Sequence, residues 1–301
     1  MPNISNSNNN PNQEGGGKVR NLILRTLTGI IFLAVMIGGI LYSPLTFGLL
    51  FTVITCLSVW EFTGIMNRRA DVSVNRFICT VAGGCLFVGF FGYAAGIPGG
   101  AALFVPWLLS MIYLLVGELY LQRESPLNNW AYAVLSQLYV ALPFSLLCLL
   151  EFTSIGTTGD EHLLEGTGSW LVLAIYVLLW TNDTGAYCVG SLLGRHKLFP
   201  RISPGKSWEG SVGGAVFCLA LSQVGAYYYP ALSSMEWAFF ALVVVVFGTW
   251  GDLIESLLKR QMGIKDSGKI LPGHGGMLDR FDSSLLAIPA AIAYLYTLVV
   301  L

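Results

Sequence analysis

The segment from Trp237 to Leu253 reads WAFFALVVVVFGTWGDL and carries no charged residue before Asp252, near its end. A run of this kind is typical of a membrane-spanning helix. The segment that follows, residues 256–282, reads SLLKRQMGIKDSGKILPGHGGMLDRFD and holds five of the sixteen Lys and Arg residues of the chain. A chain with few charges that gathers them directly after an apolar run is expected to carry out its chemistry there.

The composition of the whole chain indicates an integral membrane protein. Of its 301 residues 54% are hydrophobic and only 11% are charged, whereas soluble domains carry about 25% charged residues. A soluble fold with buried helices needs charged outer faces between its apolar runs, and this sequence lacks them. We therefore predict an all-α, polytopic membrane protein with about nine transmembrane helices. The expected spans are residues 22–42, 45–65, 77–95, 101–121, 130–150, 170–189, 211–229, 237–253 and 285–301.

The basic residues are distributed unevenly between the two sides of this arrangement. All sixteen fall in the N-terminal tail with the start of the first span, or in residues 66–76, 122–129, 190–210 and 254–284. The connections on the other side contain none, and one of them carries Asp160, Glu161 and Glu165. Because positive charge stays on the cytoplasmic side during insertion, we predict a cytoplasmic N-terminus and an external C-terminus. Every functional-looking polar cluster then faces the cytoplasm.

Three regions are expected along the chain. Residues 1–21 form an Asn-rich polar tail that cannot bury a core and is predicted to be disordered. Residues 22–165 hold the first five spans, and residues 166–301 hold the last four with the loops 190–210 and 254–284. The six cysteines stand singly in apolar segments without a metal-binding spacing. They are therefore interpreted as small core or lipid-facing residues.

Three acidic residues stand where two spans meet the cytoplasmic surface. Asp252 ends one apolar run, and Asp279 and Asp282 lie three residues apart just before the last one. A spacing of three puts two side chains on one face of a helix, and oxygen ligands suit magnesium. Asp279 and Asp282 could instead only favour the start of a helix. An acid as near the membrane core as Asp252 is costly and indicates function, so we predict that the three carboxylates bind a metal ion.

Basic residues share the same loop with these acids. Lys259, Arg260, Lys265 and Lys269 could bind substrate phosphate, and they could equally bind anionic lipid headgroups or orient the protein. Arg280 lies directly between Asp279 and Asp282 in the sequence. It is therefore a candidate for a phosphate contact beside a metal ion, or for an ion pair that holds the acids.

A second cytoplasmic loop contains the sequence SPGKS at residues 203–207. Gly-Lys-Ser is part of the P-loop motif, but the first glycine of that motif would fall on Pro200, and no βαβ context is present. We expect a rigid Pro-Gly turn that presents Ser203, Lys206 and Ser207 to a phosphate group. The alternative is an ordinary helix start with Ser207 near its cap.

Two further polar residues have more than one interpretation. His274 lies in a Pro-Gly-His-Gly-Gly turn that permits close approach to phosphate, although a flexible interhelical loop has the same composition. Its imidazole could assist proton transfer or be structural. Asp183 lies beside Asn182 inside the sixth span, where an acid can bind a coupling ion, satisfy a neighbouring lysine or line a substrate cavity. The sequence does not separate these roles.

Taken together, these segments resemble the phosphatidate cytidylyltransferase family, the CDP-diacylglycerol synthases. Blocks that fit the family are NDTGAY at residues 182–187, SPGKSWEG at 203–210, and Gly251-Asp252-Leu253 with Glu255 and Ser256. Its long signature is matched at every position from Ser256 to Asp282. That signature reads Ser256-x-x-Lys259-Arg260-x4-Lys265-Asp266-x-Gly268-x2-Leu271-Pro272-x-His274-Gly275-Gly276-Met277-x-Asp279-Arg280-Phe281-Asp282. The resemblance covers the C-terminal half, the first five spans agree only in hydropathy, and the tail lies outside it.

The resemblance implies that CTP and phosphatidic acid react to CDP-diacylglycerol and pyrophosphate, with magnesium as cofactor. It also implies a helical protein, commonly a homodimer, in a bacterial-type cytoplasmic (inner) membrane. The active site would face the cytoplasm, the partners would be the two substrates and the lipid bilayer, and no nucleic acid is expected. By position, Asp252, Asp279 and Asp282 would hold the metal centre, which in the family can pair a divalent ion with potassium.

Two sets of site residues are thus predicted. The catalytic set is Asp252, Asp279, Asp282, Lys206 and Arg280. The substrate-binding set is Ser203, Lys206, Ser207, Lys259, Arg260, Lys265, His274 and Asp183. Phosphatidic acid already carries a nucleophilic phosphate, so catalysis is expected to consist mostly of positioning and charge neutralisation.

Two competing classes of function fit the sequence less well. A secondary transporter could use Asp183 and Asp252 as coupling-ion sites, but it predicts internal symmetry that is not visible and does not explain the charge-dense loop. A CDP-alcohol phosphotransferase or a polyprenol or phytol kinase is closer in chemistry. The acid spacing here does not match the longer Asp-Gly motif of the CDP-alcohol phosphotransferases.

Overall fold

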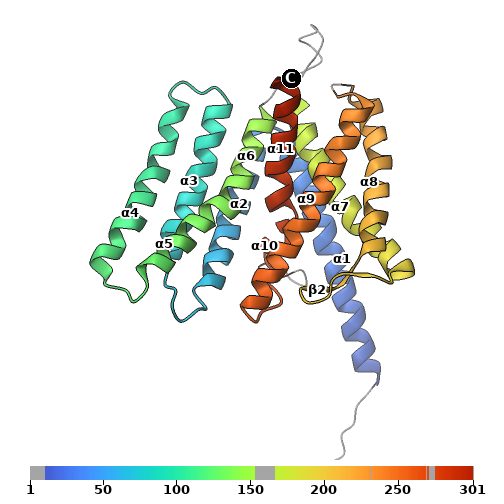
Figure 1. Cartoon of the computed structure of the whole chain (residues 1–301), viewed down its shortest axis with the longest axis horizontal. Coiled ribbons are helices and arrows are strands. Elements are labelled where there is room, and N and C mark those ends of the chain that lie inside the picture. Colours follow the sequence, from blue (N-terminus) through green and yellow to red (C-terminus); the bar gives the residue numbers. More distant parts are fainter. Residues whose placement is uncertain (1–10, 153–166, 231, 269, 271–274, 301) are drawn as a thin grey trace, which may run out of the picture.

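The computed structural model of the chain is a bundle of long helices with one short β-hairpin (Figure 1). It describes residues 11–152, 167–230, 232–268, 270 and 275–300. The elements in chain order are α1 (Pro11–Leu41), α2 (Pro44–Met66), α3 (Arg76–Ala94), η1 (Gly100–Phe104), α4 (Val105–Leu121), α5 (Pro126–Leu135), η2 (Ser136–Ala141), α6 (Leu142–Glu151), α7 (Thr167–Leu193), β1 (Lys197–Phe199), β2 (Ser203–Ser207), α8 (Trp208–Tyr228), α9 (Ser234–Gln261), α10 (Leu278–Phe281) and α11 (Ser284–Val300).

The predicted fold class is confirmed. Within the described residues, eight helices are long and apolar enough to cross a membrane, and Thr26–Leu41 of α1 is a shorter apolar helix. Each lies at an expected span, and helix α1 begins at Pro11, inside the tail for which the sequence predicts disorder. Helix α9 continues to Gln261, beyond the expected end at Leu253. The charged residues that follow Leu253 are therefore helical, so their side chains lie on defined faces.

Local sequence explains where several of these helices begin. The Ser43 hydroxyl accepts a hydrogen bond from the Thr46 amide (3.2 Å), and the Thr46 hydroxyl accepts one from the Ser43 amide (3.1 Å), with Pro44 at the first helical position. Ser233 and Glu236 form the same reciprocal pair at the start of α9. Such capping boxes satisfy amides that the first turn of a helix leaves unpaired.

An aromatic cluster in the interior fixes the short helix α10 in the bundle. The Phe281 ring is buried and packs edge-on against Phe144 of α6 (5.5 Å between centroids) and Tyr176 of α7 (5.9 Å). It also contacts Phe32 of α1 at 5.9 Å. Aromatic pairs of this kind contribute about 0.5–1.5 kcal/mol each beyond simple burial. The two residues that flank Phe281 in the chain, Arg280 and Asp282, are thereby held at a fixed place among α1, α6 and α7.

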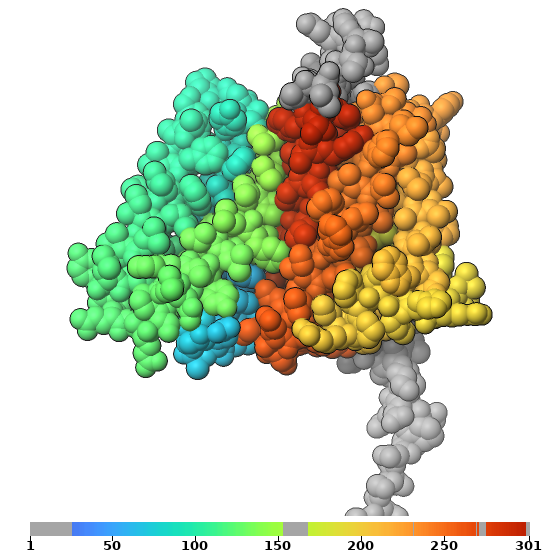
Figure 2. All heavy atoms as spheres, in the orientation of Figure 1, coloured from blue at the N-terminus to red at the C-terminus, as the bar shows by residue number. Residues whose placement is uncertain are grey.

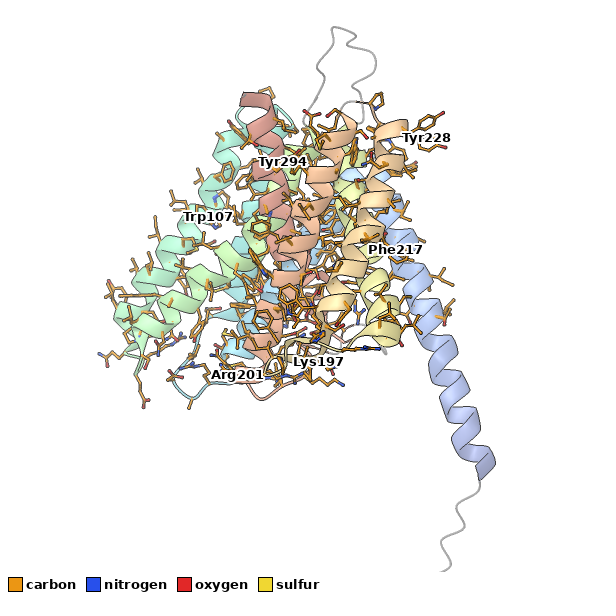
Figure 3. The ribbon with its side chains drawn as sticks, turned by 45° about the vertical axis from the view of Figure 1, so that its right-hand side comes forward. Trp107, Lys197, Arg201, Phe217, Tyr228 and Tyr294 are labelled. Atoms are coloured by element: carbon orange, nitrogen blue, oxygen red, sulfur yellow. The ribbon has the colours of Figure 1, made fainter. Side chains whose placement is uncertain are left out.

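The connections that carry most of the charged residues lie at one end of the bundle. Figure 1 shows the α2–α3, α4–α5 and α7–α8 connections at the lower end, α10 in the lower half of the bundle, and the C-terminus at the upper end. Figure 3 labels Lys197 and Arg201 at that lower end and Tyr228 and Tyr294 near the other. The arrangement brings loops that are far apart in sequence to a common surface.

The loop expected at residues 190–210 contains a two-stranded antiparallel hairpin, β1 paired with β2. Its base is closed by the Trp208 amide, which donates to the His196 carbonyl at 2.9 Å. The Glu209 carboxylate accepts from the amides of Arg195 and His196 at 3.2 Å. The hairpin lies across the lower end of the bundle, next to the orange residues of α9 (Figure 2). There Arg260 of α9 donates to the Ile202 carbonyl at 3.3 Å, which ties hairpin and helix together.

Candidate active site

The last three turns of α9 present four polar side chains to the interior of the lower end. Asp252 and Ser256 are four residues apart, and the Ser256 hydroxyl donates to Asp252 Oδ1 at 3.1 Å. Glu255 and Lys259 have the same spacing, with Lys259 Nζ 3.0 Å from Glu255 Oε1. Residues four apart are neighbours on a helix surface. Because α9 continues beyond its expected end at Leu253, these residues are helical and form the two pairs.

The hairpin supplies a lysine to this face of α9. Lys206 Nζ of β2 lies 2.6 Å from Asp252 Oδ2, and each side chain is about a quarter exposed (25% and 26%). The adjacent Ser207 caps helix α8, because its hydroxyl accepts from the Gly210 amide at 3.2 Å. The helix start at Ser207, which was the alternative interpretation, is thus confirmed. The expected Pro-Gly turn is wrong, because Pro204 and Gly205 lie in strand β2, and this strand carries Lys206 towards an acid.

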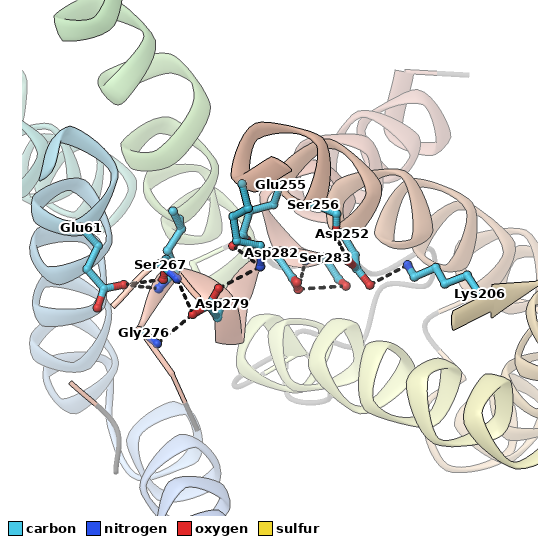
Figure 4. A network of polar contacts seen from close by, with 12 residues as sticks. Glu61, Lys206, Asp252, Glu255, Ser256, Ser267, Gly276, Asp279, Asp282 and Ser283 are labelled. Atoms are coloured by element: carbon cyan, nitrogen blue, oxygen red, sulfur yellow. Dashed lines mark hydrogen bonds and ion pairs between the residues drawn. The ribbon is translucent and has the colours of Figure 1, made fainter. Parts of the chain in front are cut away.

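Asp279 is the point where three segments meet (Figure 4). Its Oδ1 lies 2.8 Å from Lys259 Nζ, and its Oδ2 accepts from the amides of Ser267 and Gly276, both at 2.8 Å. Gly275 has a φ of +83°, and a Cβ there would lie 2.7 Å from Asp279 Oδ2. Glycine is required at this position because the backbone is left-handed and the carboxylate fills the space.

Asp282 stands between α10 and α11. Its Oδ1 accepts from the Ser283 amide at 2.6 Å and from the Ser283 hydroxyl at 3.3 Å. The backbone beside it touches α9 closely, since a Cβ on Gly251 would lie 2.7 Å from the Asp282 carbonyl oxygen. Gly251 therefore allows the chain at Asp282 to approach the turn of α9 that carries Asp252.

Two cavities border this cluster. The first, which we call the carboxylate cavity, has a volume of about 310 Å³. It is lined by Thr28, Gly29, Phe32, Leu33, Trp180, Asp183, Asp252, Asp279, Arg280 and Asp282. The second, which we call the hairpin cavity, has a volume of about 420 Å³. It is lined by Asn182, Asp183, Ala186, Tyr187, Ser203, Gly205, Lys206, Ser207, Gly210, Ser211, Thr249 and Asp252. Asp183 and Asp252 line both, so the two cavities meet at these carboxylates.

The structure brings most of the predicted site residues to these two cavities. The hairpin cavity is lined by Ser203, Lys206 and Ser207. The carboxylate cavity is lined by Asp279, Arg280 and Asp282. Asp183 and Asp252 line both cavities. Lining a cavity was one of the roles left open for Asp183, and its side chain fits that role.

Three other predicted residues are placed differently, and a fourth lies outside the described residues. Lys259 is held between Glu255 and Asp279 and is only 13% exposed. Arg260 is exposed and donates to the Ile202 carbonyl. Lys265 is exposed and lines neither cavity. His274 lies outside the described residues. A direct role of these four in substrate binding stays a prediction.

The residues around the cavities fit a divalent cation in charge and in donor chemistry. Five carboxylic acids face three basic side chains, which leaves a formal excess of two negative charges. These groups are Asp183, Asp252, Glu255, Asp279, Asp282, Lys206, Lys259 and Arg280. Their oxygens are the hard ligands that magnesium takes. Within the described part of the chain, no three His, Cys, Asp or Glu side chains are grouped tightly enough to hold a metal ion, so the metal centre of Asp252, Asp279 and Asp282 stays a prediction.

Sequence reasoning missed two acids of this cluster. Glu255 was named only within a block that fits the family and was given no role, yet its side chain is fully buried against Lys259. Glu61 comes from α2, in the half of the chain where only hydropathy matched, and it accepts hydrogen bonds from Ser267 and Leu278. A signal for Glu61 was present, because an acid inside a membrane span indicates function by default.

Fold and site together define the class of this protein: an integral membrane protein that holds acidic and basic side chains around two cavities at one end of its helix bundle. The sequence profile of the Cytidylyltransferase family matches residues 23–298. The chain therefore belongs to the cytidylyltransferase family, which confirms the resemblance found in its motifs.

Individual relatives give the same assignment. A protein of Staphylococcus aureus (strain COL) named phosphatidate cytidylyltransferase is 33% identical over 270 residues, which cover 88% of this chain and 96% of that protein. A protein of the same name from Haemophilus influenzae is 29% identical over 280 residues, covering 88% of this chain and 95% of the relative. The similarity therefore extends over the N-terminal spans as well as the signature.

Proposed function

We propose that this chain transfers the cytidylyl group of CTP to phosphatidic acid, giving CDP-diacylglycerol and pyrophosphate. The supporting observation is the junction of the two cavities at Asp252, where Lys206 lies 2.6 Å away. A site that joins two polyanionic substrates needs positive groups and a cation at their meeting point. Membership of the cytidylyltransferase family and the names of the relatives point to the same reaction.

CTP is assigned to the hairpin cavity. Its walls include Ser203 and the exposed Gly205 of β2 and the start of helix α8 at Ser207. The N-terminal end of a helix carries a partial positive charge, which favours phosphate. Lys206 adds a full positive charge beside this helix end.

Phosphatidic acid is assigned to the carboxylate cavity. Phe32, Leu33 and Trp180 line it from α1 and α7, so one wall is apolar while Arg280 and the acids form the other. A lipid whose tails stay in the bilayer presents its phosphate at such a boundary. Arg280 is the group that we expect to hold this phosphate in a charge-assisted hydrogen bond.

The chemistry then requires little beyond positioning. An oxygen of the lipid phosphate forms a bond to the α-phosphorus of CTP, the bond between the α-phosphorus and the bridging oxygen to the β-phosphate breaks, and pyrophosphate leaves. The nucleophile is already an anion and needs no strong base. Lys206 would neutralise the triphosphate while Arg280 holds the attacking phosphate, which lowers the repulsion between the two anions.

Magnesium is the expected cofactor. Asp252, Asp279 and Asp282 would hold it, with potassium as a second ion, and it would supply positive charge to the phosphate oxygens. Asp279 already uses both oxygens to bind Lys259 and two backbone amides. Asp252 also uses both oxygens, for Ser256 and Lys206, whereas the hydrogen bonds of Asp282 among the described residues are accepted by Oδ1, from Ser283. Within this set Asp282 is therefore the main candidate ligand.

The site is assigned to the cytoplasmic face of a bacterial-type inner membrane. The connections that carry most of the basic residues lie at the lower end of the bundle (Figure 1), and the β1–β2 hairpin at that end lines the hairpin cavity. Basic loops stay in the cytoplasm. CTP is a soluble substrate and would reach the site from that side. We also propose a homodimer, because the span Gly100–Leu121 is only 11% buried within one chain and leaves a broad apolar surface.

The proposed reaction is tested with purified protein, radiolabelled CTP and phosphatidic acid in detergent, with and without magnesium. We expect labelled CDP-diacylglycerol only when protein, lipid and magnesium are all present. Phosphatidic acid replaced by diacylglycerol or a polyprenol serves as the control for the kinase and phosphotransferase alternatives. Label transfer to those alcohols, without product from phosphatidic acid, would contradict the proposal.

A further inference from the structure

Glu61 of α2 is a buried acid that belongs to the site by contact, although it lines neither cavity. Its side chain is only 5% exposed. Its Oε2 accepts a hydrogen bond from the Ser267 hydroxyl at 3.0 Å and another from the Leu278 amide at 2.9 Å. Figure 4 shows the carboxylate pointing from α2 towards Ser267. One oxygen therefore binds two parts of the chain: Ser267, within the connection between α9 and α10, and Leu278, the first residue of α10.

The same two parts of the chain are also held by Asp279. The Ser267 amide donates to Asp279 Oδ2, while the Ser267 hydroxyl donates to Glu61. The Gly276 amide also donates to Asp279 Oδ2, and Gly276 lies two residues before Leu278. Ser267 thus stands between two carboxylates, one from the N-terminal half of the chain and one that lines the carboxylate cavity.

The glycines of this connection leave room for the Glu61 carboxylate. A Cβ placed on Gly268 would overlap Glu61 Oε1, and a Cβ on Gly276 would overlap Glu61 Oε2 and the Ser267 hydroxyl. The backbones of Gly268 and Gly276 also pack together, since the Gly276 Cβ would lie 2.7 Å from the Gly268 amide nitrogen. These two positions of the signature are glycine because the loop ends close around an acid from another helix.

We propose that Glu61 is a positioning residue, which closes the α9–α10 connection and thereby fixes Asp279 and the adjoining α10 at the carboxylate cavity. This inference rests on the proposed cytidylyl transfer for its activity readout. Glu61 acts through hydrogen bonds accepted by one oxygen, from a hydroxyl and from an amide. Glu61 therefore acts as a hydrogen-bond acceptor whose side chain must have a defined length. A glutamine side chain has the same length and provides the same oxygen acceptor.

The test compares Glu61→Ala, Glu61→Gln and Glu61→Asp in the full chain, with Glu118→Ala as the matched control. Glu118 is also a buried acid on a span, and it binds Arg123 and Asn129, each at 2.9 Å, away from the site. For each variant kcat, the KM for CTP, the thermal midpoint and hydrogen exchange of residues 265–280 are measured. A positioning residue of this kind is expected to change activity by about 10- to 100-fold.

We expect Glu61→Ala to lower kcat by about that factor with little change in the KM for CTP, and to speed exchange over 265–280. Glu61→Gln should stay close to wild type in both readouts, and Glu61→Asp, which is one methylene too short, should resemble Glu61→Ala. The control Glu118→Ala should lower the thermal midpoint without lowering kcat of the folded protein. Unchanged kcat and exchange in Glu61→Ala, or an equal loss in Glu61→Gln, would overturn the proposal.

A further variant and a readout that needs no turnover allow the test to be decided even if Glu61→Ala does not fold or the enzyme is inactive. Ser267→Ala removes the hydroxyl donor but keeps the amide that binds Asp279, so it should lower kcat even if Glu61→Ala does not fold; wild-type kcat in Ser267→Ala would then overturn the proposal. Exchange over 265–280 needs no turnover. If the wild-type protein made no CDP-diacylglycerol, the proposed function would fail while the exchange data still decided the role of Glu61.

Discussion

Replacing Lys206 by methionine removes the positive charge at the junction of the two cavities while keeping a side chain of similar length. Lys206 Nζ lies 2.6 Å from Asp252 Oδ2, and both side chains are about a quarter exposed. An ion pair that is open to solvent to this degree stabilises a fold by only about 0–1 kcal/mol. The free energy of unfolding should therefore change little in Lys206→Met.

The effect on catalysis should be much larger. A single preorganised donor to a developing anion contributes about 3 kcal/mol to the transition state, which corresponds to a factor on the order of a hundred in rate. Lys206 lines the cavity assigned to CTP and is, in that assignment, the donor nearest the triphosphate. We expect kcat/KM for CTP to fall by about that factor in Lys206→Met.

The assay is formation of labelled CDP-diacylglycerol from labelled CTP, with folded protein measured by size-exclusion chromatography. Lys197→Met is the matched control, since Lys197 lies on β1 of the same hairpin, is exposed and lines neither cavity. The control should keep wild-type kcat/KM. Wild-type kcat/KM in Lys206→Met, or an equal loss in both variants, would refute the role assigned to Lys206.

Three other predictions address the acids, the loop and the metal. Asp282→Asn should abolish turnover with little loss of folded protein, and near wild-type activity would contradict its assignment as a metal ligand. Gly276→Ala places a Cβ against Glu61 and Ser267, so it should destabilise the protein by about 1–3 kcal/mol; an unchanged thermal midpoint would argue against that packing. Chelation of divalent cations should stop product formation and added magnesium should restore it, whereas turnover that persists in the chelator would exclude a required divalent ion.

Hydropathy predicted the helix bundle because a lipid bilayer demands a minimum apolar length for each span. It did not predict where α9 ends. Residues 254–261 include the charged Glu255, Lys259 and Arg260 and so interrupt the apolar pattern. The helix nevertheless continues to Gln261, and Lys259 pairs with Glu255 and Asp279. A buried ion pair of this kind depends on the segment that carries Asp279, and the hydropathy of a single span contains no information about that segment.

Residue type predicted the carboxylates of the site, but the partners of its basic residues came only from the structure. Lys206 was expected to face phosphate, and it lies in a cavity wall beside Asp252. The pairing follows from the β1–β2 hairpin, whose short strands include Pro204 and Gly205 and leave little strand pattern in the sequence. The way two distant loops meet at one end of a bundle is set by packing rather than by local pattern.

Glu61 illustrates the same limit across a long separation in the chain. Its partners Ser267 and Leu278 lie more than two hundred residues further along the chain. Its position inside a span indicated importance, but nothing in the sequence connected it to the signature. Gly268 was named only as a position of the signature, and Gly276 was interpreted as part of a turn that approaches phosphate or of a flexible loop. Only the structure shows that both glycines make room for this acid.

The most direct test of the proposed reaction follows the two ends of the CTP triphosphate. Wild-type protein in lipid nanodiscs is incubated with phosphatidic acid, magnesium and CTP that carries its label at either the α- or the γ-phosphorus. Cytidylyl transfer predicts that the α-label enters the lipid fraction as CDP-diacylglycerol and that the γ-label leaves in pyrophosphate. Recovery of the γ-label in lipid, or of neither label in lipid, would contradict transfer of the cytidylyl group to phosphatidic acid.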